Sequence, residues 1–485
     1  MPPVRRIVLV EPRPEDSHIF SRFPMPRLGV VILGTLLRDL GYEVSVFVES
    51  VAPLDWDVVA RADLVGFSAI TSTARRSYAL ADRVRGLGIP VVMGGPHPTH
   101  RPDDALGHSD WVLRGEAEAT LPVLVEALGL PEEAREAALD RIPGLSRRKD
   151  GAPVHAPIAP LEPDLDRWPD PDPDLVHGHH ESRSLHGYRI VPIQTSRGCP
   201  YDCSFCTVTT TFGRRVRYRS VERVVAEMAR HDLAHTHFFF YDDNFAADPR
   251  RVRALLAGIR SLPRKTHWSA QVRADVARDT ALLDEMRETG CGTLYLGLES
   301  VHPESLEAVH KQQRVSETAT FLDRIADRGI EVHGMFIFGF DNEPHDIVEA
   351  TVAFARRHRV HSVQFMILTP LPGSRWGDEV ESQGRLITHD WSLFDAHHVC
   401  FRPEGCTPAE LQRRQMVGHD RFYAWSEVPR RALAGDWAGV ALVLYARNLN
   451  RTWQRRNRPY LAWLEEVSRP AAPLEGASEE ASAAK

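Results

Sequence analysis

Three cysteines stand close together near the middle of the chain, at a spacing that suits an iron–sulfur cluster. Cys199, Cys203 and Cys206 form a C-x3-C-x2-C pattern in the stretch Gln-Thr-Ser-Arg-Gly-Cys-Pro-Tyr-Asp-Cys-Ser-Phe-Cys, directly after a strand-like run. Three thiolates on one tight loop can hold three irons of a four-iron, four-sulfur cluster, and no fourth cysteine lies near them in the sequence. The fourth iron would then be open to a small molecule.

Two other chemistries also use thiols. Thiolates bind zinc as readily as iron, but a structural zinc site normally has four ligands in two pairs, and the second pair is missing here. Disulfides are disfavoured because only 6 cysteines occur in 485 residues and no secretory signal is visible. The cluster is therefore the preferred interpretation of the motif.

Length and composition bound the remaining possibilities. A chain of 485 residues with 43% hydrophobic residues can build more than one domain. Its net charge of −7 argues against a nucleic acid held by charge alone, and we expect the arginine-rich stretches 214–219, 250–253 and 451–458 to be solvated helix faces. No apolar run approaches the length of a membrane span, so we expect a soluble, cytoplasmic protein without transmembrane segments.

The cysteine motif resembles the cluster loop of radical S-adenosylmethionine (SAM) enzymes, C-x3-C-x-aromatic-C, with Phe205 in the aromatic position. In that family SAM occupies the open iron, and its reductive cleavage gives a 5′-deoxyadenosyl radical. The resemblance therefore implies a [4Fe-4S] cluster and SAM as cofactors. It also implies an external one-electron donor such as flavodoxin or ferredoxin, because no second cluster motif is visible.

The first 145 residues alternate between strand-like and helix-like runs. The strand-like runs are 6–11, 43–48, 64–68, 90–93 and 111–113, and the helix-like runs are 28–40, 74–87 and 119–128. This alternation predicts a doubly wound, Rossmann-like parallel sheet over residues 1–145, with ligands beyond the carboxyl ends of its strands.

Three short motifs stand at those strand ends, G-x-S-x-x-T, G-G-x-H and G-E. Together they resemble the cobalamin-binding domain that precedes the catalytic barrel in a large subclass of radical SAM enzymes; a Rossmann-like domain that has lost its cofactor is the alternative. By this resemblance the residues that bind cobalamin are Ser68, Thr71, Gly94, Gly95, His97, Gly115 and Glu116. His18 is not expected to ligate cobalt, because the D-x-H-x-x-G motif of the methionine-synthase type lacks its glycine here.

Residues 146–187 read as a connector. A small hairpin is predicted at 147–157 around Asp150-Gly151, and the proline-rich remainder cannot build a core. His177, His179 and His180 are expected to be exposed loop histidines rather than a metal site.

The alternation restarts over residues 188–376 and predicts a partial (β/α)6 radical SAM barrel. The strand-like runs are 188–194, 236–242, 267–273, 293–299, 331–339 and 361–368, and the helix-like runs are 220–232, 249–260, 279–289, 303–328 and 345–358. In such barrels the chemistry lies at the carboxyl ends of the strands.

The family resemblance assigns several of these strand ends to SAM. Asp242 and Asp243 would meet its amino or ribose end, and Arg273 and Glu299 would contact its carboxylate and ribose. The alternative is that Arg273 and Glu299 pair with each other across adjacent strands. Cys291 is expected to be a buried thiol.

Residues 377–467 resemble the mostly helical extension of the subgroup that includes the hopanoid C-2 methylase, and would cap the open side of the barrel. Packing within this cap is favoured over acid–base chemistry for His397 and His398. Residues 468–485 are expected to be disordered.

The family resemblance implies a cobalamin-dependent radical SAM enzyme that methylates an unactivated carbon of a small molecule or lipid through methylcobalamin. The alternative is an oxidative cyclase or ring-rearranging enzyme of the anaerobic magnesium-protoporphyrin ester cyclase type, without methyl transfer. A non-catalytic cobalamin or redox sensor is a third possibility, which the intact cysteine loop disfavours. Nothing in the sequence specifies the substrate.

Overall fold

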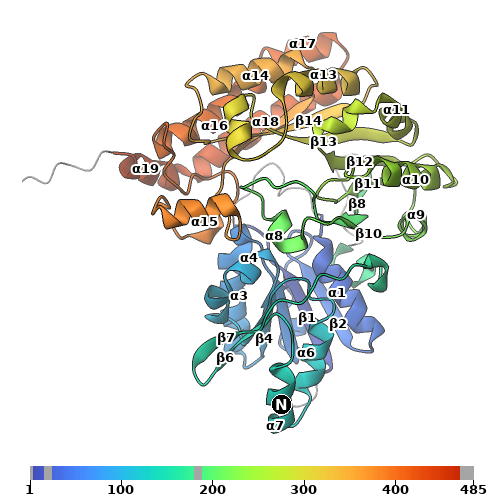
Figure 1. Ribbon diagram of the computed structural model, residues 1–485, viewed down its shortest axis with the longest axis vertical. Helices are drawn as coiled ribbons and strands as arrows, with labels where there is room; N and C mark the ends of the chain where they lie inside the picture. Colours follow the sequence, from blue (N-terminus) through green and yellow to red (C-terminus); the bar gives the residue numbers. More distant parts are fainter. Residues whose placement is uncertain (1–3, 16–24, 180–187, 470–485) are drawn as a thin grey trace, which may run out of the picture.

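The computed structural model describes residues 4–15, 25–179 and 188–469, which form two lobes (Figure 1). The N-terminal lobe is built on a mostly parallel sheet, and the second lobe on a curled parallel sheet with helices outside it. The predicted α/β class with a Rossmann-like domain, a partial barrel and a helical extension is confirmed. Within the described ranges, no helix is both long and apolar enough to cross a bilayer.

The N-terminal sheet has seven strands in the order β2-β1-β3-β4-β5-β6-β7. The strands are β1 (Arg6–Glu11), β2 (Glu43–Val48), β3 (Leu64–Ser68), β4 (Val91–Gly94), β5 (Trp111–Leu113), β6 (Leu145–Lys149) and β7 (Ala152–His155). The main helices are α1 (Leu28–Asp39), α3 (Ala74–Gly86), α4 (Pro96–His100), α5 (Pro102–Leu106), α6 (Leu121–Leu128) and α7 (Glu132–Leu139). The first five strands are parallel, and their β-branched and aliphatic side chains fill two cores, one on each face.

The connector differs from the free linker that its composition predicts. The predicted hairpin forms, but β6 pairs with β5 in antiparallel register and so extends the N-terminal sheet. Further along, the backbone N–H of His177 donates to the carbonyl of Val46 in β2, and its ring stacks on Phe47 with ring centroids 4.1 Å apart. His179 is buried. The expectation of exposed histidines is therefore wrong for both, because this segment packs against β2; His180 and His18 lie outside the described residues.

The barrel sheet has six parallel strands in the order β15-β14-β13-β12-β11-β8. They are β8 (Arg189–Ile193), β11 (Thr236–Phe240), β12 (His267–Val272), β13 (Cys291–Glu299), β14 (Glu331–Phe338) and β15 (Ser362–Ile367). The outer helices are α9 (Val221–Ala229), α10 (Pro249–Arg260), α11 (Thr280–Glu288), α12 (Pro303–Ala308), α13 (Val315–Ala326) and α14 (Ile347–Arg357). A two-stranded ribbon of β9 (Ser196–Arg197) and β10 (Arg217–Tyr218) flanks the cysteine loop, and α8 (Val208–Phe212) follows it.

The C-terminal extension covers the open edge at β15. It consists of α15 (Arg375–Ser382), the turn η6 (Trp391–Leu393), α16 (Pro408–Phe422), α17 (Glu427–Leu433), α18 (Trp437–Arg456) and α19 (Arg458–Val467). The Tyr423 hydroxyl donates to the carbonyl of Val363 in β15 and accepts from its N–H, both at 2.9 Å, so the edge strand is held from outside. The disorder predicted for residues 468–485 falls on 470–485, outside the described part of the chain, except at its first two residues, where the Ser468 hydroxyl accepts from the backbone N–H of Ala409 at 2.9 Å.

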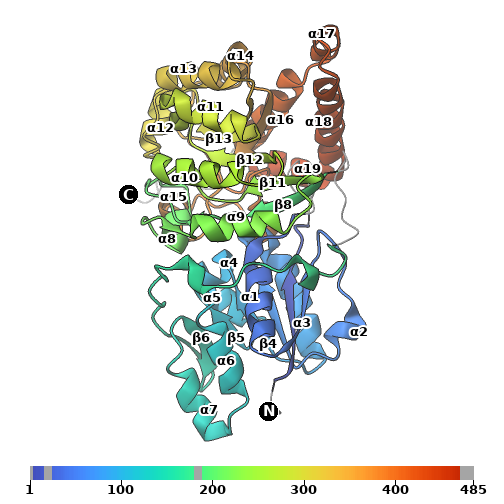
Figure 2. The same cartoon turned by 90° about the vertical axis from the view of Figure 1, so that its right-hand side faces the viewer.

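The extension also reaches back to the N-terminal lobe. In η6 the indole N–H of Trp391 donates to Asp104 at 3.2 Å, and Asp390 pairs with Arg75 at 2.6 Å. Figure 2 shows the two lobes stacked along the long axis, with α4 facing the barrel side. The carboxyl ends of both sheets are thus held near one another.

Candidate functional site

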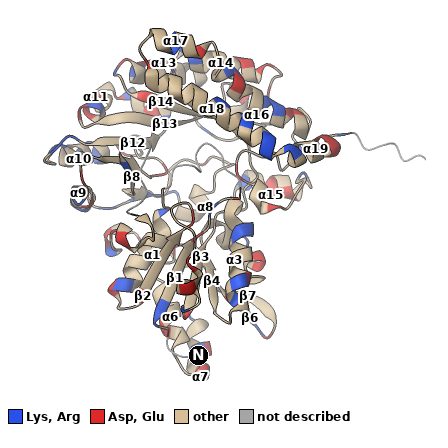
Figure 3. Ribbon diagram, turned by 180° about the vertical axis from the view of Figure 1, so that it is seen from behind, with Lys and Arg blue, Asp and Glu red and all other residues tan. Residues whose placement is uncertain are grey.

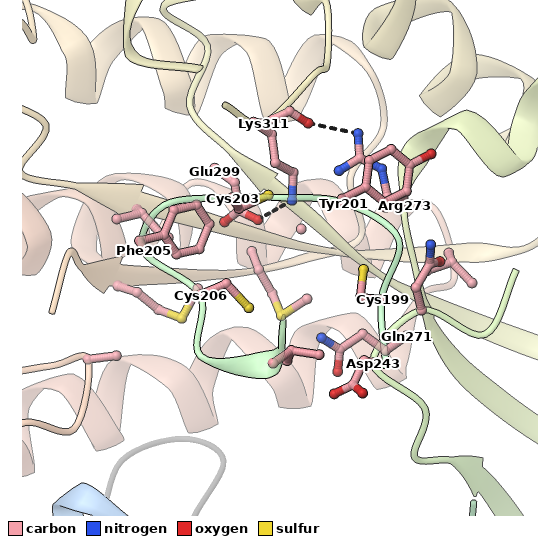
Figure 4. Close-up of a pocket in the computed structure, with 18 of the residues that line it drawn as sticks. Cys199, Tyr201, Cys203, Phe205, Cys206, Asp243, Gln271, Arg273, Glu299 and Lys311 are labelled. Carbon is pink, nitrogen blue, oxygen red and sulfur yellow. Dashed lines mark hydrogen bonds and ion pairs between the residues drawn. The ribbon is translucent and has the colours of Figure 1, made fainter. Parts of the chain in front are cut away.

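A cavity of about 540 Å³ lies at the carboxyl ends of the barrel strands (Figure 4). One part of its wall carries the three cysteines of the motif, and another carries polar side chains from the ends of β11, β12 and β13. The remaining wall is largely apolar. Its side chains include Phe205, Phe212, Phe239, Met335, Ile337, Met366, Leu368 and Leu371.

The start of the cysteine loop is fixed by two aspartates. Asp242 Oδ1 accepts hydrogen bonds from the backbone N–H and hydroxyl of Thr195 and from the hydroxyl of Ser196. Asp243 accepts from the backbone N–H of Gly198 at 3.1 Å. Gly198 has φ +94°, and a Cβ there would stand 2.9 Å from two carbonyl oxygens, so only glycine fits the turn into Cys199.

The Asp242 carboxyl has a raised pKa. Burial raises this pKa to about 6, although three hydrogen-bond donors favour the charged form. Its second oxygen, Oδ2, is buried and accepts no hydrogen bond from the described residues. A donor entering the cavity can therefore satisfy it.

A second polar group faces the loop from β12 and β13. The Lys311 ammonium pairs with the Glu299 carboxylate at 2.5 Å, and both side chains are buried. Arg273 donates to the carbonyls of Lys311 and Gln312 and stacks on Tyr201, with its guanidinium carbon 3.6 Å from the ring centroid. In Figure 4 the Lys311–Glu299 pair lies beside Cys203 of the cysteine loop.

These contacts show that one alternative prediction, an ion pair between Arg273 and Glu299, is wrong. Arg273 and Glu299 do not pair with each other in the structure; both instead bind the segment that follows α12. Glu299, His310 and Gln312 have φ of +59°, +54° and +51°, which is uncommon for residues other than glycine. Such strained backbone persists only where its surroundings hold it, and it clusters at functional sites.

Lys311 and Tyr201 are the site residues that the sequence reasoning missed. Tyr201 lies inside the cysteine motif, between its first two cysteines. Lys311 carried a weak signal, because the chain has only four lysines among its 59 basic residues. Burying one lysine in a chain that otherwise uses arginine is unusual, since an ammonium loses more hydration than a guanidinium.

The chemistry of the cavity fits a cluster and a zwitterionic ligand. Cys199, Cys203 and Cys206 are free thiols that line the same space. Among the described residues, no three histidine, cysteine or acidic side chains converge closely enough to hold a single metal ion. Buried Asp242 Oδ2 lacks a hydrogen-bond partner within the described chain, so an acceptor remains for a ligand. Arg273 Nε also makes no hydrogen bond there, and it lies 3.8 Å from Asp275 Oδ1 in an ion pair.

The residues predicted for cobalamin lie together at the ends of β3, β4 and β5, but several already bind one another. His97 is 1% exposed; its Nε2 lies 2.9 Å from the Tyr78 hydroxyl and its Nδ1 3.4 Å from that of Thr71. Burial lowers the pKa of His97 to about 3. Gly95 has φ +97°, and a Cβ there would stand 2.7 Å from the carbonyl oxygen of Ala69, beside Ser68.

Glu116 connects the two lobes. It pairs with Arg217 of β10 at 2.6 Å and with Arg197 of β9 at 3.3 Å, while Glu118 pairs with Arg197 at 2.6 Å. Burial alone would raise the pKa of Glu116, but the hydrogen bonds and charges of Arg217 and Arg197 lower it. Arg217 and Arg219 are both buried, so the prediction that 214–219 is a solvated face is wrong for these two arginines, while Arg214 and Arg215 are exposed. Local charge density could not reveal acidic partners from distant segments.

The remaining candidates behave as packing residues. Cys291 is fully buried, as predicted, and burial raises the pKa of its thiol. His398 lies 3.0 Å from Asp395 through Nδ1 and 3.1 Å from Asn457 through Nε2. His397 contacts Gln415 of α16 through Nδ1 at 3.2 Å. Both histidines are therefore part of the hydrogen-bonded interior of the extension.

Comparisons with known proteins also divide the chain into two parts, which correspond to the N-terminal lobe and the barrel. The model of the radical SAM superfamily matches residues 193–355, and that of the B12 binding domain matches residues 21–125. An uncharacterized methyltransferase of Pyrococcus horikoshii is 29% identical over 435 residues, 87% of this chain and 93% of that protein. The bacteriochlorophyllide d C-12(1)-methyltransferase of Chlorobaculum tepidum is 26% identical over 434 residues, 88% of this chain and 89% of that protein.

Two relatives that the sequence resemblance named are also found. The hopanoid C-2 methylase of Rhodopseudomonas palustris is 25% identical over 403 residues, 80% of this chain and 72% of that protein. The anaerobic magnesium-protoporphyrin IX monomethyl ester cyclase of Rubrivivax gelatinosus is 26% identical over 443 residues, 86% of this chain and 77% of that protein.

A solved structure supports the fold. The cobalamin-dependent SAM radical enzyme OxsB, with aqua-cobalamin and SAM bound, has a TM-score of 0.71 at 15% identity, covering 93% of this chain and 72% of that chain. The two family models show that the chain carries a radical SAM domain over residues 193–355. More specifically, a B12 binding domain at residues 21–125 precedes it, and the cofactors are those of these two domains, a [4Fe-4S] cluster, SAM and cobalamin.

Proposed function

We propose that this enzyme transfers a methyl group to an unactivated carbon of an apolar small molecule or lipid. The observation that carries the proposal is a single cavity in which three free thiols and a buried ion pair face an apolar wall. When bound there, the cluster and SAM supply a 5′-deoxyadenosyl radical, and cobalamin supplies the methyl group. The methyltransferase names of several relatives support the same choice.

Each thiol of the motif would bind one iron. Cys199, Cys203 and Cys206 lie on a loop whose entrance is held by Asp242 and Asp243, so the loop keeps its shape when the irons bind. Phe205 would cover the loop from the apolar side, since it packs against the barrel core. One iron would then have no cysteine ligand, and it could bind SAM.

The polar wall suits the two ends of SAM. A guanidinium or an ammonium binds a carboxylate, and a carboxylate accepts hydrogen bonds from ribose hydroxyls or an amino group. We assign Arg273 and Lys311 to the carboxylate of SAM, and Glu299 to its ribose. Asp242 and Asp243 would face the amino group, because Asp242 Oδ2 is buried and still has capacity to accept.

We further propose that cobalamin binds between the lobes, against the loops after β3, β4 and β5. Ser68, Gly94 and Gly95 offer a close backbone approach, since the two glycines present no side chain to the ligand. Thr71 and His97 would shape the loop from within, as their mutual contact indicates. Gly115 and Glu116 would hold the rim of the site, where the ion pairs of Glu116 join it to the barrel.

The apolar wall would bind the substrate and exclude water. Met335, Met366 and Leu368 provide hydrocarbon and thioether surface without a titratable group, which favours an apolar substrate over a charged one. Excluding water would also keep the radical from side reactions. The electron that starts the reaction would come from flavodoxin or ferredoxin in the cytoplasm.

A second candidate function uses the same cofactors without methyl transfer. The cyclase relative covers 86% of the chain, against 87% and 88% for the first two methyltransferases, so oxidative cyclisation or ring rearrangement is the alternative. Anaerobic incubation of reconstituted protein with SAM, cobalamin, dithionite and cell extract distinguishes the two. Methyl transfer predicts S-adenosylhomocysteine together with 5′-deoxyadenosine. Formation of 5′-deoxyadenosine alone would favour the cyclase, and no SAM cleavage at all would contradict both.

A further inference from the structure

The most exposed large apolar side chains of the described structure lie on α17 and α18. Leu433 is 91% exposed and Trp437 69%, and the nearby Trp425 and Leu444 are 53% and 43% exposed. We call these four residues the α17–α18 patch. Figure 2 shows both helices at the outer edge of the barrel lobe, away from the N-terminal lobe. Large apolar groups gathered on a surface mark an interaction site more often than scattered ones do.

The first half of α18 is apolar on both of its sides. The ten residues 437–446 carry no charged side chain. On the inner side Val443 and Ala446 are buried. On the outer side Trp437 and Leu444, spaced by two helical turns, remain exposed. A helix that is apolar all round is normally covered on every side, and the outer side has no cover within the described chain.

Arginines border the Trp425 end of the patch. Arg447 and Arg451 lie over the Trp425 ring, with guanidinium carbons 4.9 Å and 5.9 Å from its centroid. The segment 425–458 contains seven arginines and two acidic residues, a net charge of +5 in a chain whose net charge is −7. Figure 3 shows α18 tan over its first part and blue toward α19.

We propose that the α17–α18 patch is a docking surface for an anionic lipid membrane, on which the protein rests without spanning it. Exposed tryptophan and leucine insert into the boundary between headgroups and acyl chains, and arginines beside them bind lipid phosphates. A second copy of the chain is a poorer occupant, because a symmetric interface would bring two segments of net charge +5 together. The inference goes beyond methyl transfer and does not depend on it.

The test is co-sedimentation of the purified, reconstituted full chain with vesicles. Vesicles of equal parts phosphatidylglycerol and phosphatidylcholine should bind the protein, pure phosphatidylcholine should bind it weakly, and high salt should release it. The double variant Leu433→Ser/Trp437→Ser should weaken binding by about tenfold or more, because two large apolar groups no longer insert. Trp437→Phe should retain binding, since it keeps an aromatic ring.

A matched control uses apolar residues of similar exposure elsewhere. Leu40 and Leu87 are each 53% exposed on the N-terminal lobe, and Leu40→Ser/Leu87→Ser should leave vesicle binding unchanged. Equal binding of the two double variants would overturn the proposal, as would absence of binding to anionic vesicles. A dimer in sedimentation equilibrium that Leu433→Ser/Trp437→Ser dissolves, without vesicle binding, would also overturn it. SAM cleavage under dithionite is expected to be the same for all these variants, so the outcome is independent of the proposed reaction.

Discussion

The two lobes use the carboxyl ends of parallel strands in different ways. At the barrel end, side chains from β11, β12 and β13 face a shared cavity, and some of their polar atoms have no partner in the described chain. At the N-terminal end, the motif residues largely bind one another or the other lobe: His97 binds Tyr78, and Glu116 binds Arg217. The carboxyl ends of the strands thus leave polar atoms available for a ligand in the barrel lobe. In the N-terminal lobe the equivalent residues instead stabilise loops and the interface between the lobes.

This difference distinguishes residues that contact a cofactor from residues that shape its site. A buried polar atom without a partner loses hydration free energy until a ligand supplies the missing hydrogen bond. A buried ion pair such as Glu116–Arg217 instead fixes the relative position of two elements. Substitutions at the barrel end should therefore impair cofactor chemistry, whereas substitutions at the N-terminal end should loosen the contact between the lobes.

The largest effect is expected at the cysteine loop. Replacing Cys199, Cys203 or Cys206 by alanine should reduce SAM cleavage to background, because the cluster loses one of its three protein ligands. Iron content and 5′-deoxyadenosine under dithionite measure the effect. Cys291→Ala is the matched control, because the Cys291 thiol is buried away from the cavity. This variant should keep both its iron content and its formation of 5′-deoxyadenosine. Normal activity of a loop variant would contradict the assignment.

The next effect is expected at the buried ion pair beside the cluster loop. Lys311→Met leaves the Glu299 carboxylate without its partner, which should lower the free energy of unfolding by about 3–5 kcal/mol. The double variant Lys311→Met/Glu299→Gln should recover part of this loss, as urea unfolding of the apoprotein would show. Glu304→Gln, in an exposed pair with His302, should cost about 1 kcal/mol or less. Additive losses at Lys311 and Glu299 would show that the two groups do not interact.

A substitution at Glu116 tests whether the N-terminal site residues stabilise the contact between the lobes. Glu116→Gln weakens charged hydrogen bonds to Arg217 and Arg197, and should lower stability by about 2 kcal/mol and increase proteolysis between the lobes. The absorbance of bound cobalamin should change little after reconstitution. Loss of cobalamin with unchanged stability would instead make Glu116 a direct contact of the cofactor.

The smallest effect near neutral pH is a pH dependence set by His97. Burial lowers the pKa of His97 to about 3 in the folded protein, from an ordinary value of 6.5. Between these values the unfolded chain binds a proton that the folded chain does not, so stability falls as pH decreases below 6.5, by about 1.4 kcal/mol per pH unit. His97→Gln should remove this contribution from the pH profile of urea unfolding. An unchanged profile would contradict the buried, neutral imidazole.

Local sequence patterns predicted the fold and the cysteine loop, but not which residues from distant segments contact one another. The C-x3-C-x2-C spacing and the strand-end positions of Arg273 and Glu299 are visible in the chain because both depend on short-range order. Lys311 could not be found this way, since a left-handed backbone after α12 turns it toward the loop. Nor could the burial of Arg217, which depends on a carboxylate 101 residues away. Contacts between distant segments have no local period.

The most direct test of the account is electron paramagnetic resonance of the anaerobically reconstituted, dithionite-reduced protein before and after SAM is added. The account predicts about four irons per chain, a signal of a reduced four-iron cluster, and a change in that signal when SAM binds the iron that has no cysteine. Protein that carries zinc in place of iron, or a cluster signal that SAM leaves unchanged, would contradict it.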